Sequence, residues 1–172
     1  MVAAAFDAPY GRRMPPCTDV YIWVDNPTPG LLRRFISRYV RQDEPGSDGA
    51  RLEAFERVYI DESPESGDQE SLGGLGEGAE FDGTFTIYLA SPEYCGVIIA
   101  PMGDGAVVLG VSLDDPDGSP ATLDRALTVM EELRAEYGSP AAIAGVELPP
   151  PRTRLEWATT LGVERRIGAL GI

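Results

Sequence analysis

The chain has 172 residues, 43% of them hydrophobic, which is enough for a single domain with its own core over residues 1–172. Its 28 acidic residues outnumber 14 arginines, and neither lysine nor histidine occurs, so the formal net charge is -14. The missing imidazole and amine side chains exclude Ser-His-Asp and Cys-His nucleophilic systems, histidine-ligated zinc, Schiff-base lysines and the P-loop lysine.

An irregular arm, a strand and a helix are predicted at the start of the chain. The arm covers residues 1–17. Residues 20–24 alternate aliphatic with aromatic side chains, which predicts a strand that contacts other elements on both faces. Thr28 and Pro29 suit the N-cap and first turn of a helix, and the apolar spacing after them predicts this helix over residues 29–41.

The next segment, residues 43–82, carries most of the surplus negative charge, with 13 acids against two arginines. Its only strong apolar run predicts a strand over residues 54–60. An acidic, glycine-rich loop is expected to follow over residues 61–80. A run of like charges is typical of a solvated loop, and it is also typical of a docking surface for a basic partner.

Three segments in the second half have the length and apolar content of strands: 81–89, 96–102 and 106–113. The last two are joined through Asp104-Gly105, which is typical of a tight hairpin, so an antiparallel meander is predicted. A helix is expected to begin at Ser119-Pro120 and to end at Gly138.

A final strand is predicted over residues 141–148, and three prolines end it. Thr153 and Glu156 have the spacing of a capping box, which predicts a short helix near the C-terminus. The order of elements predicts an α+β fold with a mixed or largely antiparallel sheet of about five to six strands, two main helices on one face and a short C-terminal helix.

Other motifs do not indicate a cofactor, a metal or a catalytic residue. Gly74–Ala79 has the form of a dinucleotide-binding turn, but it lacks a strand before it and a helix after it. Asp114–Gly118 lacks the spacing and closing glutamate of a calcium-binding EF-hand. Cys17 and Cys95 are isolated, as is typical of a cytoplasmic protein, and the sequence leaves open whether they pair. We expect neither a signal peptide nor a membrane-spanning helix.

Two groups of residues are candidates for binding a partner. The acidic candidates are Asp61, Glu62, Glu65, Asp68 and Glu70. The aromatic candidates are Tyr21, Trp23 and Tyr88, which are predicted to share one face of the sheet. Tyrosine and tryptophan are enriched at interfaces, although the same spacing also suits a second core layer beneath a helix.

Several features resemble the small immunity proteins of bacterial toxin systems: acidic charge, small size, a strand-helix opening, a meander followed by a helix, and the string Glu147-Leu148-Pro149-Pro150-Pro151. The resemblance implies a compact cytoplasmic α+β domain without catalytic residues that binds and blocks a toxin. It assigns no role to any residue. Alternatives are an acidic secretion chaperone, which would be dimeric, and an enzyme that uses carboxylates on a small or cationic substrate.

Repulsion by the negative charge argues against nucleic acid and anionic membranes as partners. We expect a basic protein partner, and the sequence does not distinguish a monomer from a dimer.

Overall fold

The computed structural model describes residues 16–41, 46–73, 84–115 and 118–171. They form a six-stranded sheet in the order β2-β3-β4-β1-β5-β6, and every neighbouring pair of strands is antiparallel. The strands are β1 (Cys17–Val24), β2 (Ile87–Leu89), β3 (Gly96–Pro101), β4 (Val107–Asp114), β5 (Ala141–Val146) and β6 (Arg165–Gly168). The helices are α1 (Pro29–Tyr39), α2 (Gly46–Phe55), the π-helix η1 (Glu56–Ile60), α3 (Asp68–Gly73), α4 (Pro120–Tyr137) and α5 (Arg154–Thr159). This arrangement confirms the predicted α+β class.

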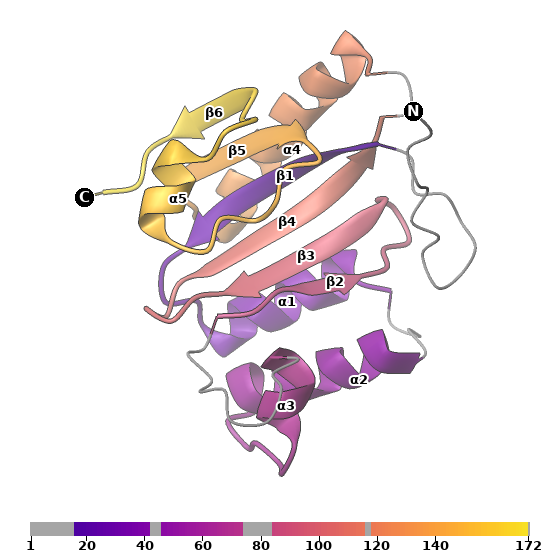
Figure 1. Cartoon of the computed structure of the whole chain (residues 1–172), viewed down its shortest axis with the longest axis vertical. Helices are drawn as coiled ribbons and strands as arrows, with labels where there is room; N and C mark the ends of the chain where they lie inside the picture. Colours follow the sequence, from indigo (N-terminus) through magenta and orange to yellow (C-terminus); the bar gives the residue numbers. More distant parts are fainter. Residues whose placement is uncertain (1–15, 42–45, 74–83, 116–117, 172) are drawn as a thin grey trace, which may run out of the picture.

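The sheet separates two hydrophobic cores, and strand β1 contributes side chains to both of them. Its alternation directs Val20, Ile22 and Val24 toward α1 and α4, where they join the larger core. Tyr21 and Trp23 point to the other face and join a smaller core with Trp157 of α5. Figure 1 shows α1 and α4 on one side of the sheet and α5 on the other, so the prediction that strand β1 contacts elements on both faces is confirmed.

The two main helices begin where the sequence predicts. The Thr28 side chain accepts a hydrogen bond from the Leu31 amide at 3.1 Å, and the Ser119 side chain accepts one from the Ala121 amide at 3.2 Å. Gly138 follows α4 with a left-handed φ of 64°, a conformation that favours glycine at a helix end. Both helices pack their apolar sides onto the sheet.

The predicted strand over residues 54–60 is wrong, because this segment is helical. It contains the end of α2 and the whole of η1, where the Asp61 amide donates to the Glu56 carbonyl at 2.8 Å. Phe55 and Tyr59, four residues apart, stack their rings with centroids 4.9 Å apart. Apolar residues at this spacing share one helix face, and that arrangement prevails over the strand propensity of Val58, Tyr59 and Ile60.

Other boundaries also differ from the predictions. The acidic loop expected over residues 61–80 contains α3 at 68–73, while residues 74–80, including the Gly74–Ala79 motif, lie outside the described residues. Cys17 belongs to β1 and not to the predicted arm. Residues 1–15 of the arm lie outside the described residues. The short edge strand β6 was not predicted. Residues 81–83 of one expected strand, and Pro116 and Asp117 of the Asp114–Gly118 motif, are likewise not described.

Gly110 of β4 permits the close approach of Tyr21. A Cβ atom on Gly110 would lie 2.4 Å from Cδ1 of Tyr21 and 2.8 Å from the Val20 carbonyl oxygen. We expect Gly110→Ala to lower the free energy of unfolding by about 1–3 kcal/mol in thermal or urea denaturation. Gly96→Ala on β3 is the matched control, because its added Cβ would meet nothing closer than 3.6 Å. Equal stability losses in the two variants would contradict the steric explanation.

Within the described residues, the helices are all too short or too polar to cross a membrane.

Candidate protein-binding surface

Residues 46–73 form a folded unit beside the β2 edge of the sheet, which we call the acidic helical unit. It consists of α2, η1 and α3, and Figure 1 shows it at one end of the molecule. Arg51 of α2 joins its parts, since Nη2 donates to the Leu72 carbonyl at 2.9 Å and to the Thr86 carbonyl at 2.8 Å. These bonds connect α2 to α3 and to the residue before β2, so the unit is held against the sheet.

Asp68 stabilises the inside of this unit. Its carboxylate receives hydrogen bonds from Nη2 of Arg57 at 2.7 Å and from the Glu65 amide at 2.7 Å. The Arg57 hydrogen bond, followed by that of the Glu65 amide, holds the pKa of Asp68 below its ordinary value. The Asp68 side chain is only 4% exposed, so this carboxylate does not lie at the surface where the expected contact with a partner would form. The ion pair occupies the carboxylate that a partner would need.

The other four acidic candidates lie on the surface of the unit. The side chains of Asp61 and Glu65 are 51% and 72% exposed, and Glu62 and Glu70 are exposed as well. Asp61 pairs with Arg33 and Glu65 pairs with Arg57, with the charged atoms 3.3 Å and 3.8 Å apart. Exposed pairs of this kind stabilise little. These carboxylates therefore retain most of their negative field toward solvent.

The crowding of negative charge in the unit affects the ionisation of Glu56 in η1. Burial raises the pKa of this carboxyl, and repulsion by Asp61 and Glu53 raises it further. The same field that disfavours ionisation of Glu56 attracts a cation or a basic side chain that approaches from solvent.

The three aromatic candidates differ in burial. Trp23 is fully buried, and its ring meets that of Trp157 edge to face with centroids 5.5 Å apart. Tyr21 is 1% exposed and donates its hydroxyl to the Leu148 carbonyl. Neither side chain reaches the surface where the expected interface would form, and the alternative of a second core layer beneath a helix describes both of them. Tyr88 lies on the same face of the sheet, opposite Ile98, and is 56% exposed.

A polar pair that sequence reasoning missed lies on the α5 side of the sheet. Ser112 of β4 donates its hydroxyl to the carboxylate of Asp19 on β1, and these residues are directly opposite in register. Burial raises the pKa of Asp19 to about 6, although the hydrogen bonds from Ser112 and the Leu148 amide oppose this shift. A strand pattern could have indicated this buried carboxyl, because Asp19 extends the alternation of Tyr21 and Trp23.

The two cysteines, whose pairing the sequence leaves open, are neighbours in space. Their sulfur atoms lie 2.9 Å apart, and both residues are thiols, with Cys17 buried and Cys95 partly exposed. Burial and the contact with Cys95 raise the pKa of the Cys17 thiol, and nearby Asp19 and Asp114 add to this effect. Cys17 is therefore a weak nucleophile at neutral pH.

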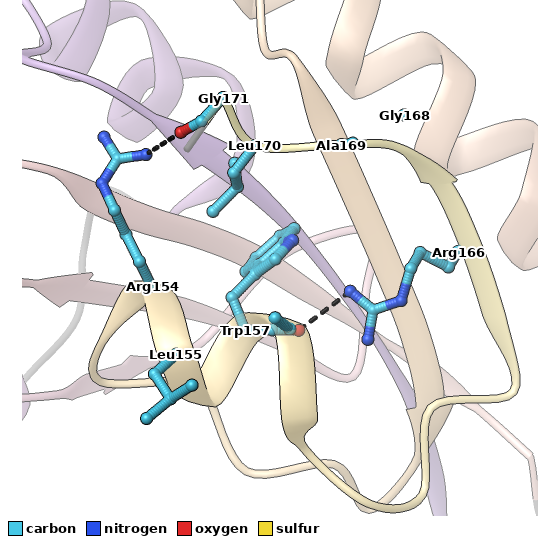
Figure 2. A pocket seen from close by; sticks show the side chains of 9 residues that line it. Arg154, Leu155, Trp157, Arg166, Gly168, Ala169, Leu170 and Gly171 are labelled. Atoms are coloured by element: carbon cyan, nitrogen blue, oxygen red, sulfur yellow. Dashed lines mark hydrogen bonds between the residues drawn. The ribbon is translucent and has the colours of Figure 1, made fainter.

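A hollow of about 440 Å³, the α5 pocket, lies between α5 and the chain that follows β6. Figure 2 shows Trp157, Leu155 and Leu170 around it, with Arg166 on one side and Arg154 on another. Arg154 forms an ion pair with Asp25 and lies 5.1 Å from the ring centroid of Trp23. The α5 pocket combines apolar walls with guanidinium groups in a protein that is otherwise strongly acidic.

Among the described residues, no group of three or more cysteine and carboxylate side chains is placed to hold a metal ion. Comparisons with protein-family models, curated proteins and solved structures found no match to this chain.

Proposed function

We propose that this chain is an immunity-type protein that binds and neutralises a basic protein toxin in the cytoplasm, with the acidic helical unit as its docking surface. The observation that carries the proposal is the exposure of Asp61, Glu62, Glu65 and Glu70 on a folded unit. Glu70 lies on α3, whereas Asp61, Glu62 and Glu65 lie in the connection between η1 and α3. A cluster of like charges on one surface attracts an oppositely charged partner and disfavours partners of the wrong charge. Tyr88, which is exposed, is the aromatic side chain that we assign to the contact with the partner.

The partner can be sought by affinity purification from the native cell. The expected result is a basic polypeptide, encoded next to this protein, whose toxicity disappears when both are expressed together. Native mass measurement of the free chain addresses the chaperone alternative, since a secretion chaperone should be dimeric and should bind an extended export segment. Toxicity that persists despite complex formation would contradict the immunity function.

The role of the unit is tested by association kinetics with the captured partner. We expect the variant Asp61→Asn, Glu62→Gln, Glu65→Gln, Glu70→Gln to associate about 10–100-fold more slowly at low salt, because electrostatic steering is lost. The difference should shrink as salt is added, since ions screen exposed charges. Stopped-flow measurements over a range of salt concentrations give both results.

A matched control removes the same number of exposed carboxylates from elsewhere. Its changes are Asp124→Asn, Glu131→Gln and Glu132→Gln in α4 and Glu164→Gln before β6. This control should associate at nearly the wild-type rate, because its carboxylates lie outside the proposed docking surface. If both variants slow association equally, net charge is responsible and the acidic helical unit is not the docking surface.

A further inference from the structure

We propose that the α5 pocket binds a small organic anion with an apolar body, at a site separate from the acidic helical unit. The volume of about 440 Å³ falls within the range typical of small-molecule sites, roughly 300–1,000 Å³. Such sites are mostly apolar with a few polar groups that orient the ligand, and the α5 pocket has this composition.

The walls of the pocket suit an apolar ligand body. Leu155, Ala158 and Leu170 line the space together with Trp157, which also belongs to the smaller core. Trp157 is only 2% exposed and is fixed by its contact with Trp23, so this wall is formed before any ligand arrives. Leu155, in contrast, is 72% exposed, and a bound molecule would remove its apolar surface from water.

Arg166 supplies the recognition of negative charge. Its Nη1 atom donates to the Trp157 carbonyl at 2.8 Å, which fixes the guanidinium beside the pocket. Arg166 is exposed, and within the described part of the chain no other protein atom accepts from its Nε or Nη2. Two donors on one planar group match a carboxylate or sulfonate, which accepts two parallel hydrogen bonds.

Arg154 has a different role at the opposite side. It is engaged by Asp25 and donates to the Gly171 carbonyl at 3.4 Å, so its charge is already compensated. Its hydrogen bond to the Gly171 carbonyl connects α5 to the segment that carries Leu170. The ligand's charge is assigned to Arg166 alone.

Arg165 provides an internal control for Arg166. In the register of β5 and β6, Arg166 is opposite Ile143 and Arg165 is opposite Ala144. Ile143 belongs to the core beneath α5, whereas Ala144 belongs to the core beneath α4. The two arginines thus carry the same charge on adjacent residues but point to opposite faces of the sheet.

The test uses two fluorescent probes with the same apolar body: 1-anilinonaphthalene-8-sulfonate and its uncharged relative N-phenyl-1-naphthylamine. Titration of the full chain should show one saturable site for the anionic probe. Arg166→Gln should weaken its binding about 10–100-fold, the effect of losing hydrogen bonds to a charged group, and Arg165→Gln should change it less than about twofold. Binding of the uncharged probe should be insensitive to Arg166→Gln.

A second variant locates the site. Ala158 is exposed on α5, so Ala158→Phe should leave folding intact, as measured by circular dichroism, while it fills the pocket and weakens both probes. Equal losses in the Arg165 and Arg166 variants, full binding in Ala158→Phe, or the absence of a saturable site would each overturn the proposal. The four-carboxylate variant of the acidic helical unit should bind both probes normally, so this test is independent of the proposed immunity function.

Discussion

Replacement of Trp157 by alanine is expected to lower the free energy of unfolding by about 3–5 kcal/mol, the range observed when large buried aromatic residues are truncated. Trp157 is 2% exposed and contacts Trp23 edge to face, so its loss removes apolar burial and leaves a cavity. Helix α5, which carries Trp157, has only six residues and cannot form stably without tertiary packing. Urea denaturation, followed by far-ultraviolet circular dichroism, measures the change.

A neighbouring residue on the same helix is the control. Leu155 is 72% exposed, so Leu155→Ala should change the free energy of unfolding by no more than about 0.5 kcal/mol. Because both variants remove apolar side chains from α5, their difference isolates the effect of burial. Similar stabilities for the two variants would show that α5 does not cover the sheet as described.

The second large effect concerns the buried carboxyl of Asp19. Its pKa in the folded protein is about 6, above the value of 3.8 for an unperturbed carboxyl, so the folded state binds more protons between these pH values. Stability from this group is therefore present below about pH 4 and is lost as the pH rises toward 6. The loss should be on the order of 2–3 kcal/mol by pH 7.

Comparison with Asp19→Asn isolates this contribution from other titrating groups. The variant should lose less stability than wild type between pH 4 and pH 7, as measured by urea denaturation across this range. Ser112→Ala should instead move the loss to higher pH, because the Ser112 hydrogen bond favours the ionised carboxyl. An unchanged pH profile in Asp19→Asn would contradict a raised pKa for this group.

The two proposed sites have opposite electrostatic character and different constructions. The acidic helical unit carries a set of exposed carboxylates, suited to steering a large basic partner. The α5 pocket is a hollow with fixed arginines, suited to a small anion. The two sites share no residues, so each can be altered without replacing residues of the other.

The sequence by itself determined the parts of the fold that depend on local chemistry. The caps at Thr28, Ser119 and Thr153 are side-chain hydrogen bonds to nearby amides, which depend on spacing of two or three residues. The alternation along β1 likewise determined which residues share a face. The absence of lysine and histidine excludes whole classes of chemistry, because no fold can supply a side chain that the chain lacks.

Tertiary structure decided the features that depend on residues far apart in the chain. Segment 54–60 is helical because its aromatic residues pack with Phe85 as well as with each other. Asp68 is internal because Arg57 reaches it, whereas four similar carboxylates nearby stay exposed. Trp23 is buried against Trp157, and Tyr21 is buried in the same core with its hydroxyl bonded to Leu148, both far along the chain. Local patterns indicate what a side chain can contact, but burial and charge pairing follow from which distant segment covers it.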